Sequence, residues 1–206
     1  MKRTLDEHAA RFDERAEEYD ASKSPEYHDC LARVIELASV RSDDTVLDIG
    51  TGTGAVALAL AADVERVIGR DISEGMLEEA RRKATADGLS NVSFDLGRFL
   101  APNYRGDADV ITSNFAMHHL DDERKRRAIA QLTEQYQPRR FILGDVMFFG
   151  HPDPAEPFYS PEVDDPATVG HLVESFTDTG YAVTHACSIH PQVGVLVAVP
   201  RSSLTD

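Results

Sequence analysis

The sequence predicts an α/β fold, in which a twisted, mostly parallel sheet of about seven strands carries helices on both faces. Three observations predict it. Short runs of β-branched and aliphatic residues alternate with helical segments between residues 45 and 147, as expected for parallel strands joined by crossover helices. A glycine-rich turn separates the first strand from the next helix. The last apolar stretch, YAVTHACSIHPQVGVLVAVP, is typical of two antiparallel strands joined by a turn at 191–194.

Two amphipathic helices are expected ahead of the sheet. Apolar residues of the first, from Leu5 to Tyr19, recur at steps of three and four, which aligns them on one helix face. The second begins at Ser24, whose hydroxyl can cap it, with Pro25 in its first turn. The chain therefore builds a helical segment before it enters the sheet.

The remaining elements follow from the same periodicities. The expected strands are TVLDI, ERVIGRD, NVSFDL, ADVITS and RRFILGDVM. Helices are expected near 54–62, 73–87, 121–136 and 166–179, and a proline-rich loop over 150–161. Ser73 and Asp121 are placed to cap two of these helices, and Gly88 to end one.

Composition limits the functions open to the chain. Its 206 residues and 42% hydrophobic content suffice for one domain with a full core. No apolar run reaches the ~18 residues of a membrane span, and the N-terminal segment lacks the apolar stretch of a signal peptide. We therefore expect a cytoplasmic protein that does not bind membranes. Cys30 and Cys187 match no metal-ligand spacing, and we expect no metal.

The charge pattern is unusual. A net charge of −15 repels a phosphate backbone and disfavours nucleic acid as a partner. The basic residues comprise 17 Arg and only 4 Lys, and the acidic residues 21 Asp and 15 Glu. This combination resembles proteins of salt-accumulating organisms, in which charge keeps the surface hydrated and salt screens self-repulsion. We expect a halophilic archaeal origin, with an acidic protein from an ordinary organism as the alternative.

The segment TVLDIGTGTGAVALAL, residues 45–60, places Gly50, Gly52 and Gly54 directly after the first expected strand. Glycine serves where the backbone must turn sharply or lie against a ligand. A strand, a glycine turn and a helix put that ligand beyond the carboxyl ends of the strands. Gly50, Gly52 and Ala55 also satisfy GxGxxA, so the glycines alone leave open a dinucleotide or another adenosine compound.

Residues at three strand ends favour a cationic adenosine compound. Asp48 precedes the turn, where a carboxylate would repel a pyrophosphate and attract an amine or sulfonium; a purely structural acid is the alternative. Asp71 ends the second strand, where a carboxylate can accept both hydroxyls of a ribose. Asn114 and the pair His118 and His119 follow the fourth strand, which is not a dehydrogenase landmark.

In their order and spacing, the segments VLDIGTGTG, GRDIS, DVITSNFAMHHLDD and RRFILGDVMF resemble the class I S-adenosylmethionine-dependent methyltransferases. The likeness covers nearly the whole chain, including RFDERAEEYD, which is similar to the lead-in of the small-molecule branch. The family implies a Rossmann-like, seven-stranded sheet in the order 3-2-1-4-5-7-6 with the last strand antiparallel. It implies one domain, residues 1–206, with a helical lid (1–40), a cofactor-binding core (41–150) and a substrate-side loop, helix and hairpin (151–206).

The resemblance implies S-adenosyl-L-methionine as cofactor and S-adenosyl-L-homocysteine as product. Asp48 would contact the cofactor's amino group, and Asp71 would hold its ribose hydroxyls. Ile72 would pack beside the adenine, and Asn114 would lie near the reacting methyl. The cofactor-binding residues implied are Asp48, Gly50, Thr51, Gly52, Gly54, Asp71, Ile72, Met76, Arg98, Phe99 and Asn114.

The sequence departs from the family at Arg98, where an acid usually accepts a hydrogen bond from the adenine amino group. Arginine offers only donors. It can stack on the purine or turn to solvent while the Phe99 amide meets the ring. Losing one such bond costs ~1 kcal/mol. Asp95 is no substitute, because three residues along a strand place it on the opposite face.

A small-molecule acceptor is expected. Alignment of acceptor, methyl and sulfur supplies much of the rate, so a catalytic side chain is optional. For a hydroxyl acceptor, His118 or His119 is the best-placed base, because imidazole titrates near neutrality; a packing role is the alternative. Tyr19, either core or part of a segment that closes over the cofactor, is expected with His118 and Asp145 to contact the substrate.

Two other functions stay open. One is an NAD(P)-dependent oxidoreductase, and the other is a non-catalytic protein that binds an adenosyl ligand in the same fold. The motifs do not choose the acceptor, nor do they distinguish a monomer from a homodimer.

Overall fold

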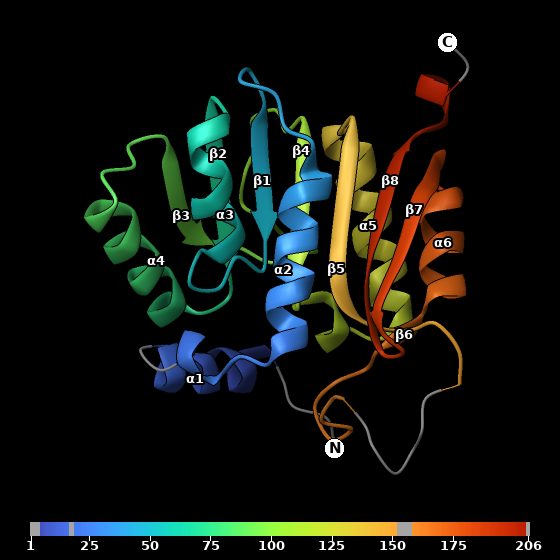
Figure 1. Cartoon of the computed structure of the whole chain (residues 1–206), viewed down its shortest axis with the longest axis horizontal. Coiled ribbons are helices and arrows are strands. Elements are labelled where there is room, and N and C mark those ends of the chain that lie inside the picture. The colour runs from blue at the N-terminus through green and yellow to red at the C-terminus, as the bar shows by residue number, and fades with distance from the viewer. Residues whose placement is uncertain (1–4, 17–18, 152–157, 205–206) are drawn as a thin grey trace.

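An eight-stranded sheet runs through the centre of the molecule (Figure 1). The computed structural model describes residues 5–16, 19–151 and 158–204. The strands are β1 (Thr45–Ile49), β2 (Arg66–Asp71), β3 (Val92–Leu96), β4 (Val110–Asn114), β5 (Arg140–Phe148), β6 (Ala167–Thr168), β7 (Tyr181–His190) and β8 (Val193–Pro200). The α-helices are α1 (Leu5–Arg15), α2 (Pro25–Ala38), α3 (Ala55–Leu60), α4 (Glu74–Ala86), α5 (Asp122–Tyr136) and α6 (Val169–Thr177). Short 3-10 turns are η2 (Asp20–Ser22), η3 (Ala61–Asp63), η4 (Met117–His119) and η5 (Arg201–Leu204).

The strand order is β3-β2-β1-β4-β5-β8-β7, with β6 paired only to β5. Strands β1 to β5 are parallel to one another, whereas β8 lies antiparallel between β5 and β7. The expected topology is confirmed. The two-residue strand β6 was not expected, and it shifts the numbers of the last two strands from 7-6 to 8-7.

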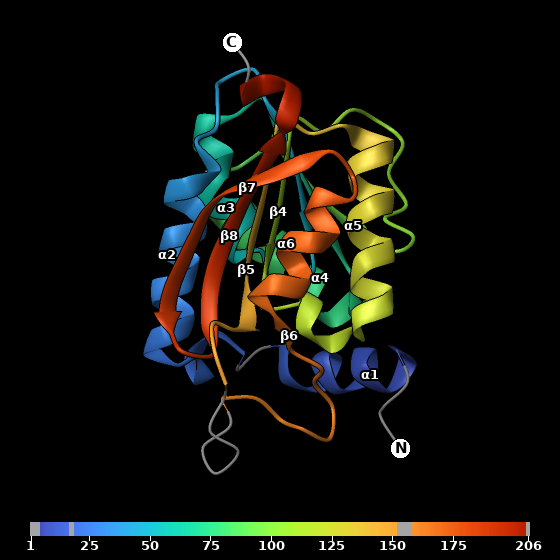
Figure 2. The ribbon, with the colours of Figure 1, turned by 90° about the vertical axis from the view of Figure 1, so that its right-hand side faces the viewer.

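Helices cover both faces of the sheet, as Figure 2 shows with α2 and α5 on opposite sides. On one face α2, α3 and α4 share a buried cluster with alternate strand residues such as Val46 and Val67. On the other face α5 and α6 pack with the intervening residues, among them Leu47 and Ile68. Because adjacent residues of a strand point to opposite faces, strands buried on both faces read as the continuous aliphatic runs seen in the sequence.

Three expected helix starts are confirmed by their caps, whereas the helix expected over 166–179 begins only at Val169, because Ala167–Thr168 form β6. The Ser24 hydroxyl accepts from the Tyr27 amide (3.3 Å), with Pro25 in the first turn of α2. Ser73 and Asp121 cap α4 and α5 in the same way, accepting from amides three residues later at 3.1 and 2.8 Å. These local bonds satisfy N–H groups that a helix start leaves open.

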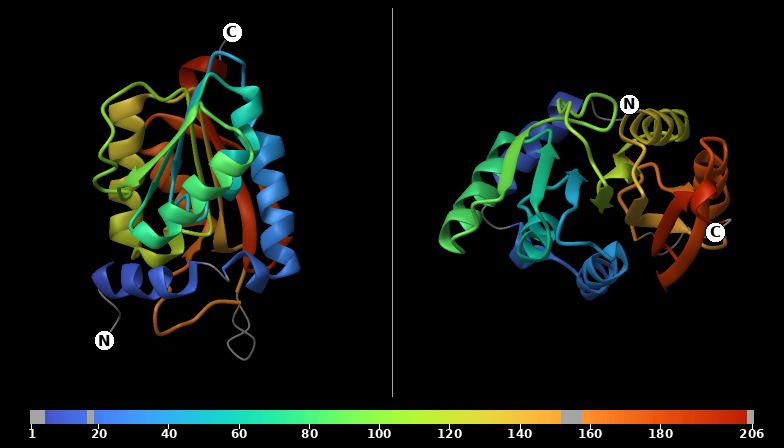
Figure 3. Two further views of the ribbon diagram at one scale, coloured as in Figure 1. Left: turned by 90° about the vertical axis from the view of Figure 1, so that its left-hand side faces the viewer. Right: turned by 90° about the horizontal axis from the view of Figure 1, so that it is seen from above.

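The front of the chain differs from its prediction. The expected helical stripe from Leu5 to Tyr19 is not one helix, because α1 ends at Arg15 and Tyr19 precedes the turn η2. Helix α1 lies across the edge of the sheet where β1 to β5 end (Figure 1 and the left view of Figure 3). Its Asp13 carboxylate accepts from the Ser73 hydroxyl (2.6 Å) and the Gly75 amide (2.9 Å), which fastens α1 to the start of α4.

Part of the expected proline-rich loop, residues 152–157, lies outside the described residues. Within the described residues, no helix is both long and apolar enough to cross a membrane.

Candidate functional site

The glycine turn after β1 adopts a backbone that favours glycine at three positions. The φ angles are +75° at Gly50, +53° at Gly52 and +85° at Gly54, all in the left-handed region. A Cβ on Gly50 would lie 2.3 Å from the Ala116 Cβ, and one on Gly54 would lie 3.1 Å from the Ala80 Cβ. A Cβ on Gly52 would meet nothing closer than 4.0 Å. Gly50 and Gly54 therefore serve the packing, whereas the Gly52 backbone faces open space.

A cavity of about 460 Å³ opens beside this turn, within the size range of small-molecule sites. Of the residues expected at a cofactor or substrate site, its lining includes Tyr19, Asp48, Gly50, Thr51, Gly52, Asp71, Ile72, Met76, Arg98, Phe99, Asn114 and His119. Three expected residues do not line it: Gly54, His118 and Asp145. Most of the residues expected from the strand ends and the glycine turn therefore line the same cavity.

Asp48 supplies a buried negative group in the lining of the cavity. Its Oδ1 accepts from the Thr112 hydroxyl at 2.7 Å. Its Oδ2 makes no hydrogen bond of good geometry among the described residues, although the Thr51 hydroxyl lies close enough to interact with the carboxylate. Burial raises the pKa of Asp48 to about 6, the hydroxyls of Thr51 and Thr112 oppose the rise, and the nearby Asp71 charge adds to it. A cationic amine would satisfy this oxygen and favour the ionised carboxylate.

Asp71 stands at the end of β2 and is held by the backbone around the turn. Its Oδ2 accepts from the Gly52 amide at 2.8 Å, and its Oδ1 accepts from the Ser73 amide at 3.0 Å. Burial raises the pKa of Asp71, while the backbone donors oppose the rise. A carboxylate has about four lone-pair sites, so acceptor capacity remains for ligand hydroxyls on the cavity side.

Asn114 lies at the end of β4 with its amide in the cavity wall. Its Oδ1 accepts from the Cys30 thiol at 3.3 Å, which fixes the plane of the amide. Its Nδ2 is buried and makes no hydrogen bond of good geometry among the described residues, although the Tyr27 hydroxyl lies close enough to interact with the amide. Together with Asp48, the cavity therefore presents one acceptor and one donor whose bonding a ligand would improve.

The cavity wall after β3 contains Arg98, the residue at which the sequence departs from the family pattern. Arg98 and Phe99 both line the cavity, and the Arg98 backbone pairs with Ala101. Asp95 does not line the cavity; its carboxylate lies 3.0 Å from the Arg70 guanidinium and is largely exposed. The expectation that Asp95 cannot replace the missing acid agrees with this placement.

Aromatic side chains from the front of the chain close one side of the cavity. Phe12 of α1 and Tyr19 contact edge to face, with ring centroids 6.1 Å apart, and Tyr27 of α2 lines the same wall. The following Asp20 accepts from the Thr53 hydroxyl at 2.7 Å and pairs with Lys83, which ties the segment to the glycine turn and to α4. Phe12 and Tyr27 were missed because they read as ordinary members of apolar helix stripes.

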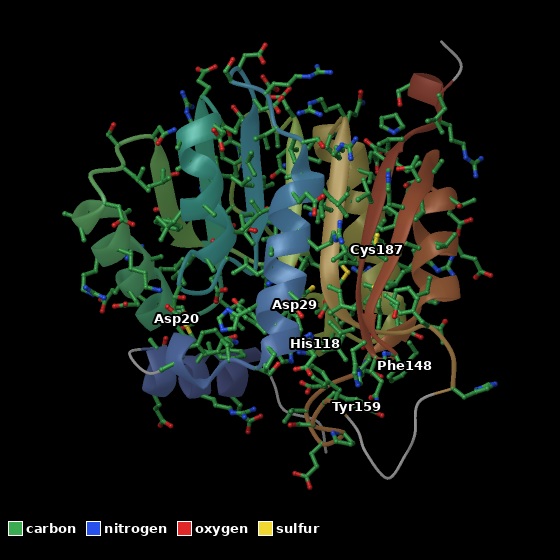
Figure 4. The ribbon with its side chains drawn as sticks, viewed as in Figure 1. Asp20, Asp29, His118, Phe148, Tyr159 and Cys187 are labelled. Atoms are coloured by element: carbon green, nitrogen blue, oxygen red, sulfur yellow. The ribbon has the colours of Figure 1, made fainter. Side chains whose placement is uncertain are left out.

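The two histidines lie in different environments. His118 is buried and excluded from the cavity lining; its Nδ1 lies 2.5 Å from Asp145 Oδ1, and its amide donates to Asp145 Oδ2 at 3.0 Å. Figure 4 places His118 near the carboxyl edge of the sheet. His119 lines the cavity, and its Nδ1 lies 2.9 Å from Asp164 Oδ1. Asp145 therefore holds His118 instead of facing the cavity as expected.

Residues 46–139 match the family model described as a methyltransferase domain. The match shows similarity to that family over 94 of the 206 residues. Over 136 residues the chain is 36% identical to the uncharacterized methyltransferase YcgJ of Bacillus subtilis, covering 65% of this chain and 53% of YcgJ. The chain spans about half the length of the first curated relatives it matches.

Solved structures of similar fold include that of the same relative, YcgJ. The crystal structure of YcgJ superposes with a TM-score of 0.65 at 27% identity and covers 77% of this chain and 71% of YcgJ. The DhpI–SAH complex superposes with a TM-score of 0.73 at 21% identity, over 95% of this chain and 96% of DhpI. At that identity the second likeness shows the fold alone. The matched segment contains the glycine turn, Asp48, Asp71 and both histidines.

Proposed function

We propose that this chain transfers a methyl group from S-adenosyl-L-methionine to a small molecule. The observation that carries the proposal is the buried Asp48 carboxylate in the lining of the cavity beside the glycine turn, whose Oδ2 makes no hydrogen bond of good geometry among the described residues. An anionic pyrophosphate at this point would be repelled, whereas the cofactor's ammonium would be attracted. None of the relatives reported above favours an NAD(P)-dependent oxidoreductase.

The cavity residues divide into groups with different tasks. Asp48 and Asn114 are proposed to hold the amino acid end of the cofactor, and Asp71 its ribose. Ile72, Met76 and Phe99 supply apolar surface for the adenine. Thr51 and the backbones of Gly50 and Gly52 complete the wall, while Gly54 supports it from outside.

Arg98 takes the place of the acid usual in the family. It is proposed to stack on the purine instead of bonding its amino group. Guanidinium groups stack favourably on aromatic rings. A chain that binds no adenosyl ligand is the alternative, and Arg98 is the feature that would favour it.

When bound, the cofactor supplies an electrophilic methyl group on a sulfonium, and its departure leaves neutral S-adenosyl-L-homocysteine. Tyr19 and the aromatic front segment exclude water from the reacting atoms. His119, which lines the cavity, is proposed to accept the proton that a hydroxyl acceptor loses. His118 is proposed to position the turn that carries His119, because Asp145 occupies its Nδ1.

The acceptor is proposed to be a small molecule instead of nucleic acid, because the chain carries a net charge of −15. The excess of Asp and the scarcity of Lys also support adaptation to high salt. The relative YcgJ comes from Bacillus, so a halophilic source rests on composition alone.

Calorimetric titration with S-adenosyl-L-homocysteine and, separately, with NAD⁺ tests the proposal. One equivalent of S-adenosyl-L-homocysteine is expected to bind, with much weaker or no binding of NAD⁺. Asp48→Asn should weaken the first interaction, whereas Asp43→Asn, an exposed position before β1, should leave it unchanged. Tight NAD⁺ binding without S-adenosyl-L-homocysteine binding would reverse the assignment. No heat with either ligand would favour the non-catalytic alternative.

A further inference from the structure

Two adjacent histidines and an aspartate 45 positions further along the chain converge beside the cavity. His118 and His119 lie in the turn η4, and Asp164 lies in the segment before β6. Asp164 Oδ1 is 3.8 Å from His118 Nε2 and 2.9 Å from His119 Nδ1. All three atoms lie within 4.8 Å of one another. The ligand atoms of a tetrahedral zinc site, about 2.1 Å from the ion, stand about 3.4 Å apart, so the observed separations bracket that spacing.

Asp145 orients His118 toward the other two residues. With Nδ1 donating to the Asp145 carboxylate, the neutral ring presents its Nε2 lone pair toward Asp164. Histidines that bind metals commonly donate their second ring nitrogen to a carboxylate in this way, which fixes the tautomer and raises the basicity of the ligand atom. The pair His118 and Asp145 therefore has the form of a metal ligand with its supporting acid.

Asp164 is fixed but not satisfied. Its Oδ2 accepts from the Ser160 amide at 2.8 Å, which holds the carboxylate in place. Its Oδ1 is buried and makes no hydrogen bond of good geometry among the described residues, although His119 Nδ1 interacts with it at 2.9 Å and His118 Nε2 lies 3.8 Å away. A buried carboxylate oxygen without a well-aligned donor is costly. A cation between the three atoms would remove that cost.

The nearest buried ammonium does not supply this charge. Lys125 Nζ donates to the backbone carbonyls of Leu120 and Asp165 and lies 3.2 Å from Asp122 Oδ1. Two carboxylates, Asp145 and Asp164, thus meet at two imidazoles inside the protein. With neutral imidazoles the cluster carries two negative charges, which a divalent ion would balance.

We propose that His118 Nε2, His119 Nδ1 and Asp164 Oδ1 bind a divalent transition-metal ion. Two imidazoles and one carboxylate suit Zn²⁺, Co²⁺, Mn²⁺ or Fe²⁺, whereas Mg²⁺ and Ca²⁺ prefer oxygen ligands. Three protein ligands leave further coordination positions for water or substrate. His119 also lines the cavity, so the ion would stand at its wall. From the cysteine spacing we expected no metal. The proposed site uses no cysteine, and its three ligands come together only in the folded chain.

Binding of the ion does not depend on methyl transfer, but it changes the role of His119. In the ion-loaded protein Nδ1 is a ligand, and a hydroxyl acceptor would release its proton to water instead of to imidazole. In the ion-free protein His119 keeps the role of base proposed above. The two forms are separable by measuring binding and activity before and after chelation.

The test uses the whole chain, without a histidine tag and stripped by a chelator, titrated with Co²⁺ and Zn²⁺. We expect one equivalent of each to bind and Co²⁺ to develop visible absorption from nitrogen and oxygen ligation. Asp164→Asn should abolish the absorption, and Asp145→Asn should lower affinity by about 10- to 100-fold, as loss of a supporting acid usually does. His185→Ala, an exposed position on β7, serves as the matched control and should bind as the parent does.

Unchanged Co²⁺ binding in Asp164→Asn, or no binding to the parent, would overturn the proposal and leave a proton-linked cluster of buried acids and imidazoles. Because Asp164 does not line the cavity, Asp164→Asn should still bind S-adenosyl-L-homocysteine. That measurement also shows that the variant is folded. Failure of the metal site and failure of the proposed cofactor site would therefore be told apart.

Discussion

Replacing Asp48 with asparagine is expected to stabilise the ligand-free protein while weakening its cofactor binding. The Asp48 carboxylate is buried, and one oxygen makes no hydrogen bond of good geometry among the described residues. Asparagine keeps an oxygen that can accept from the Thr112 hydroxyl, and it carries no charge. The substitution thus removes a buried charge without opening a cavity.

The magnitude follows from the pKa of Asp48, which burial raises from 3.8 to about 6. Because the pKa is raised in the folded protein, ionising Asp48 destabilises that state above pH 6, and the penalty disappears as the pH falls below about 4. At 1.36 kcal/mol for each pKa unit, the penalty is about 3 kcal/mol near pH 8 and roughly half of that near pH 5. The stability advantage of Asp48→Asn should therefore shrink roughly twofold between these two pH values.

Urea denaturation of parent and variant at both pH values and constant high salt measures this change, with Asp43→Asn as the exposed control. S-adenosyl-L-homocysteine should bind Asp48→Asn roughly 10- to 100-fold more weakly, since a hydrogen bond to a charged group contributes about 1.5–3 kcal/mol. An advantage that stays constant between the two pH values would refute the burial argument. A variant that binds the ligand as tightly as the parent would refute the functional role of Asp48.

Other substitutions distinguish residues that contact the ligand from residues that stabilise the fold around the cavity. Gly52→Val is expected to abolish S-adenosyl-L-homocysteine binding, because its side chain would enter open space that the ligand needs; calorimetry showing unchanged affinity would contradict the loop assignment. Gly50→Ala should instead lower the free energy of unfolding by about 2 kcal/mol or more, because its Cβ would overlap Ala116, and thermal melting checks this. Tyr19→Ala should weaken ligand binding roughly tenfold through loss of an aromatic wall, with the melting temperature nearly unchanged. Melting temperature should rise from low to molar KCl if the net charge of −15 reflects salt adaptation; a flat response would argue for an ordinary acidic protein.

Sequence reasoning recovered features that depend on neighbouring residues. The caps at Ser73 and Asp121 and the continuous buried run of β1 are local signals, and they locate two helix starts and the first strand. The glycine turn and the strand-end residues Asp48 and Asp71 followed from the rule that parallel strands end at one edge. These signals were sufficient to place the cavity.

The errors concern where side chains point and which distant residues meet. Asp145 ends up against His118, because the turn η4 folds back onto β5 and offers it two donors. Gly54, at the start of α3, packs against Ala80 of α4, and the spacing of the glycines does not reveal this contact. Asp164 lies 45 positions beyond His119, in a loop without periodicity, so no local pattern could connect it with the histidines.

A crystal structure of the protein with S-adenosyl-L-homocysteine would show whether Asp48 binds the amino group of the ligand. We expect the ligand in the cavity beside the glycine turn, with its amino group within hydrogen-bond distance of Asp48 Oδ2 and its ribose hydroxyls on Asp71. A ligand bound elsewhere, or an amino group turned away from Asp48 with that oxygen still without a well-aligned donor, would contradict this expectation.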